Sequence, residues 1–278
     1  VPFVLRFRSD GSSERKIKFS DLVKGNIEIT ENDIDHVLLK SDGIPTYHFA
    51  HAVDDHLMRT THVVRGEEWL PSLPFHLQLF ASLGFKPPKY LHISQLMKLE
   101  GDSKKKLSKR DNGAGLSYYR EAGYVSECVI EYVMTLLNSN YEEWRMANPL
   151  ADMRDFKFSI NKMSASGSLF DFDKLNDVSK NTLSRMSADK IYEYALDYAV
   201  EYDPQFAALL QRDPNYAKRI LSIGRTGAKP RKDLTLMSDV KPYVSFFYDE
   251  YFSLEAGYPE KFERQDIGEA LARFSDVF

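Results

Sequence analysis

The chain has one cysteine among its 278 residues, Cys128. A single cysteine excludes an intramolecular disulfide and any zinc site built from four cysteines. Cys128 lies in the stretch 126–138, where apolar residues recur at helical spacing after Ser126, a residue type that caps helices. The sequence therefore predicts that Cys128 is a small core side chain and not a reactive thiol.

Long apolar runs are also lacking. No run approaches the roughly 20 residues that a helix needs to cross a bilayer, and no charged and then apolar leader precedes the first strand pattern. We therefore expect a cytoplasmic protein without a membrane partner. The chain does not begin with methionine, and residues 1–8 alternate like a strand already in progress, so we expect a fragment of a longer protein.

A large net charge is lacking as well, because the formal charge is only −4. A nucleic acid would therefore have to be held by local patches. Residues 98–110 contain six Lys or Arg against two acids, residues 218–232 six against none, and residues 249–276 eight acids against three bases. This segregation permits a polyanion to lie along one side, although a charge run is usually a solvated face.

The pattern of apolar residues predicts an α/β fold. Alternation at 16–19 and 26–30 predicts a small antiparallel unit. The segments that follow are a strand at 36–40, a helix at 45–58, a strand at 62–65, a helix that starts after Ser72 and ends at Gly84, and a strand at 90–94. This alternating order predicts a parallel, doubly wound sheet whose ligand crevice lies at the carboxyl ends of the strands.

The rest of the chain predicts a mainly helical region. Beyond Ser117, amphipathic stretches occur at 126–138, 187–201 and 241–254. Ser187 stands where a helix would start.

The stretch 104–110, read as KKKLSKR, follows the third predicted strand. In isolation it reads as an exposed turn. In a loop after that strand, its ammonium groups, its hydroxyl and free backbone N–H groups could converge on a triphosphate.

Residues 106–110 resemble the lysine-rich signature loop of class I aminoacyl-tRNA synthetases, in the form typical of the glutamyl enzymes. Four further segments resemble bacterial-type glutamyl-tRNA synthetase in order and spacing, and they lie at 42–50, 53–58, 61–69 and 83–88. The resemblance covers roughly residues 20–125, and a weaker one continues through 168–175.

This resemblance implies a role for each matching residue. For glutamate binding it implies Tyr47, His48 and Arg65, where His48 replaces the usual asparagine. For ATP binding it implies Glu68, Trp69, Leu96, Met97 and Lys109. For catalysis it implies Lys106, Ser108 and Lys109. Without the resemblance, Tyr47 would be read as a core residue, Arg65 as a surface ion pair and Trp69 as an anchor for the following helix.

Two patterns are interpreted as structural. Residues 162–166, read as KMSAS, spell the synthetase signature more literally, but we interpret them as a loop between helices, far from the sheet. His48, His51 and His56 could share a helix face, but no further ligand stands at a spacing typical of zinc, so no protein-bound metal is expected.

The resemblance implies a division into four parts. They are the end of an acceptor-binding insertion at 1–35, the C-terminal half of a Rossmann-like catalytic domain at 36–115, a stem-contact helical region at 116–168, and the start of a helical anticodon-binding domain at 169–278. The histidine motif that grips ATP in this family, His-x-Gly-His, is absent from the chain. We therefore expect that this fragment alone is inactive and does not form glutamyl-adenylate.

The implied activity is that of a glutamate–tRNA ligase. Its substrates would be L-glutamate, ATP with Mg²⁺, and tRNA-Glu, and we expect a monomer without a DNA partner. Five cations are candidate tRNA contacts: Arg219, Arg225, Lys229, Arg231 and Lys232. The alternatives are a glutaminyl-tRNA synthetase-like enzyme, whose anticodon region is built of β-barrels, and a non-catalytic tRNA- or protein-binding module of the same fold.

Overall fold

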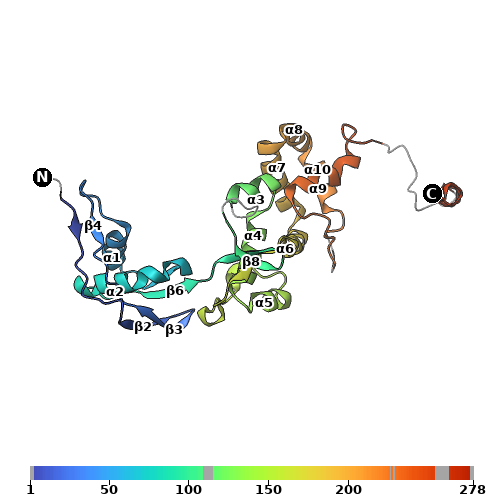
Figure 1. Cartoon of the computed structure of the whole chain (residues 1–278). Coiled ribbons are helices and arrows are strands. Elements are labelled where there is room, and N and C mark those ends of the chain that lie inside the picture. The colour runs from blue at the N-terminus through green and yellow to red at the C-terminus, as the bar shows by residue number, and fades with distance from the viewer. Residues whose placement is uncertain (1–2, 109–114, 226, 228, 254–262, 276–278) are drawn as a thin grey trace.

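The computed structural model describes residues 3–108, 115–225, 227, 229–253 and 263–275. Figure 1 shows an α/β part that contains the N-terminus and a helical part that follows it, with strand β6 (Lys89–Ile93) directed from the first toward the second. Lys109 lies outside the described residues, so its predicted roles remain predictions. No helix within these ranges is long and apolar enough to cross a membrane.

The predicted antiparallel unit is confirmed. It is a hairpin of β2 (Lys16–Asp21) and β3 (Gly25–Thr30), and the register runs from Lys16 opposite Thr30 to Asp21 opposite Gly25. Gly25 has a φ of +76°, a backbone conformation that favours glycine at a tight turn. The N–H of Leu22, in this turn, donates to the carbonyl of Tyr90, so the hairpin is bound to β6.

Among the residues that the structure describes, the parallel sheet of the α/β part consists of two strands. Strands β5 (His62–Gly66) and β6 pair in parallel, and helix α2 (Leu73–Ser82) lies between them in the sequence. Before β5 comes helix α1 (Tyr47–Leu57), and between β5 and α2 lies the 3₁₀ turn η1 (Glu67–Ser72). Phe75, Leu79 and Phe80 of α2 are buried together with Ala52 of α1, and each large apolar side chain buried in this way contributes about 1.5–3 kcal/mol.

The strand predicted at 36–40 is present, but the prediction that it belongs to the parallel sheet is wrong. Strand β4 (Val37–Leu39) pairs antiparallel with β1 (Leu5–Arg6) and not with the parallel strands. The cause is that residues 5–7 occupy the hydrogen-bonding edge of β4, where Phe7 N–H donates to His36 O. The α/β class holds, but the parallel sheet is smaller than predicted.

The lysine stretch is also different from the prediction, because residues 104–106 form a strand and not a loop. Strands β7 (Leu96–Glu100) and β8 (Ser103–Lys106) form a hairpin around Gly101, whose φ is +60°. Glu100 forms an ion pair with Lys105, which helps to neutralise a row of cations that would otherwise repel one another. The short strand β9 (Ser168–Leu169) pairs in parallel with β7.

The helical region is confirmed. Its helices are α3 (Leu116–Ala122), α4 (Ser126–Leu137), α5 (Tyr141–Ala147), α6 (Phe172–Arg185), α7 (Ala188–Tyr202), α8 (Pro204–Arg212), α9 (Pro214–Ser222), α10 (Val240–Val244) and α11 (Arg264–Ser275). Four 3₁₀ turns accompany them: η2 (Met153–Asp155), η3 (Ile160–Lys162), η4 (Met237–Asp239) and η5 (Ser245–Phe247). The predicted stretch 241–254 was too long, since α10 ends at Val244.

The helix starts follow local sequence chemistry. Ser187 caps α7 as predicted, because its side chain accepts from Lys190 N–H. Asp203 and Asp213 cap α8 and α9, each of which has proline at its first position, where no N–H is needed. The predicted cap at Ser126 is wrong, because Ser126 is already helical and its hydroxyl donates to Glu127.

Cys128 confirms the predicted core thiol. It is fully buried in the cluster that joins α4 to α6, α7 and the helices that follow. Burial raises the pKa of the thiol to about 12, so it remains protonated at neutral pH.

Candidate active site

Arg65 lies near the carboxyl end of β5, where the predicted crevice was expected. Its Nε donates to His92 Nε2 at 3.0 Å, and its Nη1 contacts His76 Nδ1 at 3.1 Å. The guanidinium carbon lies 4.7 Å from the ring centroid of Tyr90 and 5.8 Å from that of Trp69. Burial lowers the pKa of Arg65, although the side chain still carries its charge at neutral pH.

One nitrogen of Arg65 has no partner. Nη2 is buried, and no atom of the described residues forms a hydrogen bond with it. A buried donor without an acceptor costs about 1–3 kcal/mol, more when it is charged. A ligand carboxylate would remove this cost, because a guanidinium binds a carboxylate through parallel N–H groups.

Three histidines around Arg65 are neutral, with defined tautomers. A guanidinium can only donate, so His76 Nδ1 accepts, and the proton of His76 lies on Nε2, which donates to His48 Nδ1 at 2.8 Å. By the same argument His92 Nε2 accepts from Arg65, and His92 Nδ1–H donates to Asp21 Oδ2 at 2.7 Å. Burial lowers the pKa of His76 to about 2 and also lowers the pKa values of His48 and His92.

Aromatic rings lie beside this cluster. The ring centroids of Tyr47 and Trp69 are 4.7 Å apart, and the Tyr47 ring stacks on His51 at 6.0 Å. Tyr47 remains 55% exposed although it contacts these rings, so one face is accessible to a ligand. Tyr47, His48, Arg65 and Trp69, all predicted from the sequence, are thus brought together.

A second group of predicted residues lies around the β7–β8 hairpin. Met97 pairs with Lys106 in the register of the hairpin, and Leu107 N–H donates to Leu96 O at 2.9 Å. Glu68 accepts from Gln95 Nε2 at 3.1 Å, and its pKa is lowered chiefly by its own backbone N–H and by Gln95, with Lys106 a smaller cause. Ser108 follows two residues after β8 and is exposed.

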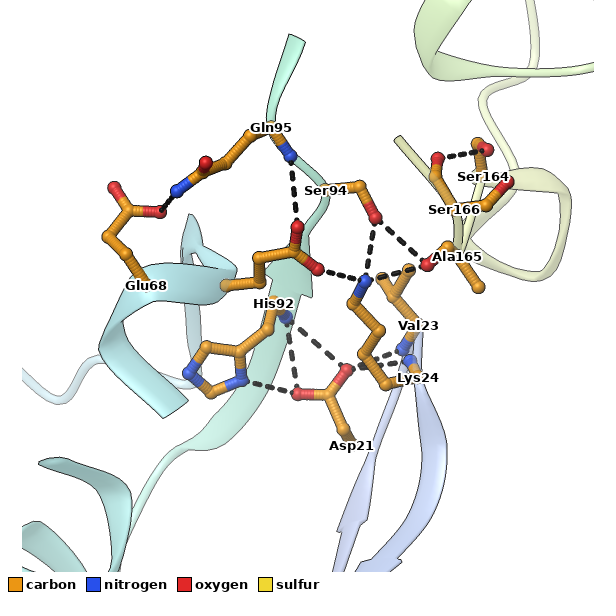
Figure 2. Close-up of polar contacts among 11 residues, drawn as sticks. Asp21, Val23, Lys24, Glu68, His92, Ser94, Gln95, Ser164, Ala165 and Ser166 are labelled. Carbon is orange, nitrogen blue, oxygen red and sulfur yellow. Dashed lines mark hydrogen bonds and ion pairs between the residues drawn. The ribbon is translucent and has the colours of Figure 1, made fainter. Parts of the chain in front are cut away.

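The turn of the β2–β3 hairpin joins both groups (Figure 2). Asp21 accepts from two backbone N–H groups of its own turn and from His92. Lys24 Nζ donates to Glu67 Oε2, to Ser94 Oγ at 2.6 Å and to Ala165 O at 2.6 Å. Lys24 is the largest cause of the lowered pKa of Glu67.

The interpretation of residues 162–166 as remote from the sheet is wrong. Ser94, which directly follows β6, donates to Ala165 O at 2.9 Å, and β9 pairs with β7 a few residues later. The segment does connect helices, as expected, and Ser164 stabilises its turn by donating to Ser166 O. It lies close to the sheet because Lys24 and Ser94 both bind its backbone.

The candidate tRNA contacts differ among themselves. Arg225 is half-buried and donates to Leu183 O at 2.8 Å, so much of its side chain serves the helical core. Arg231 is exposed and forms an ion pair with Asp233 at 2.7 Å. The other three cations, Arg219, Lys229 and Lys232, are exposed as well.

Five residues of the cluster were not predicted as members of the site: Asp21, Lys24, His51, His76 and His92. Of these, only His51 was considered, as a possible metal ligand. Among the five, His92 gave a usable signal, because a histidine within the apolar stretch 90–93 must find partners when the strand is buried. In the described part of the chain, no three His, Cys, Asp or Glu are grouped so that they could hold a metal ion.

The α/β unit, with charged side chains at the carboxyl ends of its parallel strands, and the helical region that follows it fit the class I aminoacyl-tRNA synthetases that the sequence resembles. The family model for tRNA synthetases class I (E and Q), catalytic domain, matches residues 1–177, and the chain belongs to this family.

Curated relatives agree with this membership. The chain is 48% identical over 277 residues to a glutamate–tRNA ligase of Acetivibrio thermocellus. The aligned residues make up 99% of this chain and 51% of that protein. It is 50% identical over 255 residues to one of Clostridium beijerinckii, with 91% and 46% covered. The chain thus spans about half the length of the curated relatives it matches.

A solved structure is similar as well. It is that of a glutamate tRNA ligase from Elizabethkingia meningosepticum in complex with its amino acid. The TM-score is 0.70 at 29% identity, and the alignment covers 94% of this chain and 51% of that one.

Proposed function

We propose that this chain is part of a glutamate–tRNA ligase that activates L-glutamate with ATP and Mg²⁺ and transfers the glutamyl group to the 3′ end of tRNA-Glu. The observation that carries the proposal is the unpartnered Nη2 of Arg65 beside the accessible face of Tyr47. The names of the relatives agree with it, and the similar structure from Elizabethkingia meningosepticum was solved with its amino acid.

Glutamate would be held by Arg65. Its Nη2 donates to a carboxylate of the substrate, and Tyr47 and Trp69 cover one side of the substrate's carbon chain. His48 does not hydrogen-bond Arg65 itself; it accepts from His76, and His76 accepts from Arg65. This chain of neutral donors and acceptors holds the guanidinium without placing a competing negative charge beside it.

ATP would lie toward the β7–β8 hairpin. Lys106, with Ser108 and Lys109, stabilises the negative charge that builds on pyrophosphate as a glutamate carboxylate oxygen attacks the α-phosphorus. Leu96 and Met97 contact the adenine, and Glu68 and Trp69 line the passage between the nucleotide and the amino acid. In the second step a terminal ribose hydroxyl of the tRNA attacks the glutamyl carbonyl carbon and AMP leaves.

The four-part division predicted from the sequence forms part of the proposal. Residues 1–35 and 116–168 would contact the acceptor end and stem of the tRNA, and residues 169–278 would begin the anticodon-binding domain. All elements from Phe172 onward in the described ranges are helical, which favours the glutamyl enzyme over the glutaminyl alternative with its β-barrels.

Calorimetric titration of the chain with L-glutamate tests the proposal. We expect binding by the unaltered chain and at least about tenfold weaker binding by Arg65→Gln, because Gln lacks the charged N–H fork. The matched control is Arg185→Gln, since Arg185 is a half-buried arginine, distant in sequence, whose pKa is also lowered by burial. Equal affinity of the unaltered chain and R65Q would contradict the proposal, and preference for L-glutamine would favour the glutaminyl alternative.

A further inference from the structure

Asp21 stands outside all the predicted functional residues, yet its side chain is fully buried beside the active-site cluster. Its Oδ1 accepts from Val23 N–H and Lys24 N–H, both at 2.9 Å, and its Oδ2 accepts from His92 Nδ1 at 2.7 Å (Figure 2). His92 N–H also points at this carboxylate, at 3.2 Å from Oδ2. Burial raises the pKa of Asp21, but these hydrogen bonds outweigh burial and the net shift is downward, so Asp21 is ionised.

An ionised carboxylate can only accept, and this determines the tautomer of His92. Its Nδ1 must carry the proton, which leaves a lone pair on Nε2. That lone pair faces Arg65 Nε, which can only donate. Asp21, His92 and Arg65 therefore form a row in which each hydrogen bond has one allowed direction.

We propose that Asp21 and His92 are positioning residues for Arg65: Asp21 fixes the Nδ1–H tautomer of His92, and His92 Nε2 then orients the guanidinium so that Nη2 faces the substrate carboxylate. The identity of that carboxylate as glutamate rests on the proposed function, whereas the orientation of Arg65 does not.

The few contacts around Arg65 explain why the His92 contact has a large effect on the orientation of the guanidinium. The guanidinium is planar, so two fixed nitrogens and one stacked ring define its orientation. His92 holds Nε, His76 holds Nη1 and the Tyr90 ring lies against the guanidinium face at 4.7 Å. Loss of the His92 contact removes one of the two fixed nitrogens and leaves the group free to rotate about the other.

The substitution Asp21→Asn tests the direction of the hydrogen bonds between Asp21, His92 and Arg65, because the Asn side chain has nearly the same size and shape as Asp. The Asn oxygen can still accept from Val23 N–H and Lys24 N–H, but its NH₂ then points at His92 Nδ1. His92 must give up the Nδ1 proton and carry it on Nε2, where it opposes Arg65 Nε–H. We expect the imidazole ¹⁵N resonances of His92 to report an inverted tautomer, the Arg65 Nε–H resonance to lose its hydrogen-bonded shift, and L-glutamate binding to weaken by about tenfold or more.

The matched control is Asp55→Asn. Asp55 Oδ2 lies 2.7 Å from His51 Nδ1 in the same cluster without a hydrogen bond between them, so this substitution removes a carboxylate charge beside a histidine that does not contact Arg65 through a hydrogen bond. We expect D55N to change the His51 resonances, to leave Arg65 Nε–H unchanged and to weaken glutamate binding by less than about threefold.

A second variant keeps the test decisive if D21N does not fold. His92→Gln retains a donor for Asp21 and an acceptor for Arg65, so a folded H92Q chain is expected to bind L-glutamate within about fivefold of the unaltered chain. The proposal is overturned if D21N keeps the Nδ1–H tautomer, if it inverts the tautomer without any loss of affinity, or if folded H92Q loses binding.

The failure of the proposed function would look different. In that case the unaltered chain would bind no glutamate, while the His92 tautomer and the Arg65 Nε–H resonance would still respond to D21N. The spectroscopic readout therefore tests the positioning of Arg65 on its own.

Discussion

Lys24 Nζ lies 2.6 Å from the carbonyl oxygen of Ala165, although 141 positions separate the two residues. Lys24 belongs to the turn of the β2–β3 hairpin, and Ala165 belongs to the loop that leads into β9. The same ammonium group also binds Glu67 and Ser94, so three segments at the carboxyl ends of β5 and β6 meet on one side chain. The hairpin is thereby fixed both to the candidate active site and to the loop before β9, which lies within the helical part.

The first prediction concerns Lys24→Met, which keeps the length of the side chain and removes its charge and donors. Lys24 is only 14% exposed, so Glu67, Ser94 and Ala165 would lose a donor in a partly buried place. We expect the free energy of unfolding to fall by about 1–3 kcal/mol, measured by urea denaturation.

The control for this prediction lies on the same hairpin. Lys18 pairs with Glu28 at 3.6 Å, and Lys18 is 86% exposed. Exposed ion pairs contribute little, so Lys18→Met is expected to cost less than about 0.5 kcal/mol. If both variants unfolded at the same urea concentration as the unaltered chain, Lys24 would not be the fixing residue that its contacts indicate.

The second prediction concerns the pH dependence of stability. Burial lowers the pKa of His76 to about 2 in the folded chain, against an ordinary value near 6.5. Below pH 6.5 the unfolded chain therefore binds a proton at this position and the folded chain does not. The stability that neutral His76 contributes is fully present above pH 6.5 and is lost as the pH falls through 6.5 toward 2, by about 2 kcal/mol between pH 7 and pH 5.

His76→Gln isolates this contribution. Gln can accept from Arg65 with its oxygen and donate to His48 with its NH₂, so the hydrogen-bond pattern is retained while the titrating group is removed. Urea denaturation at pH 7 and at pH 5 should show a fall in unfolding free energy that is about 2 kcal/mol smaller for H76Q than for the unaltered chain. Parallel falls in the two chains would mean that His76 is protonated in the folded chain.

The sequence indicated individual residues of the candidate site, but it did not indicate the hydrogen bonds that join them to distant parts of the chain. Tyr47, Arg65 and Trp69 stand in segments with a recognisable order, so each could be predicted as a site residue without a structure, and the structure places them close together. Asp21 and Lys24 were not found, because their partners His92 and Ala165 are 71 and 141 positions away and no periodicity reports such contacts.

The same limit explains the errors in the fold. Residues 36–40 have the apolar pattern of a strand, and that pattern is correct, but it does not say which neighbour the strand takes. Residues 5–7 pair with the edge of β4 because the chain brings them alongside it in the antiparallel direction. The cations at 104–106 were expected in a loop because they follow the third predicted strand, yet the turn at Gly101 folds them back on β7 as an exposed strand.

The third prediction concerns exposed cations of α9 and of the segment between α9 and α10. Arg219, Lys229 and Lys232 are exposed and are proposed to contact the phosphates of tRNA-Glu. Their joint substitution by Glu should weaken the binding of a tRNA-Glu transcript and should reduce the slope of log affinity against log salt concentration by about 2–3, because each lost phosphate contact removes roughly 0.7–0.9 from that slope. Filter binding at several salt concentrations measures both quantities.

The control for the third prediction must change the net charge equally. Lys40, Arg59 and Lys86 are exposed cations of the α/β part, and their joint substitution by Glu lowers the net charge by the same amount. A general repulsion between a more acidic protein and RNA would affect both triple variants alike, since it depends on total charge and not on position. A reduced slope only in the first variant is therefore expected if those three cations contact phosphates, and equal slopes in the two variants would place the tRNA elsewhere.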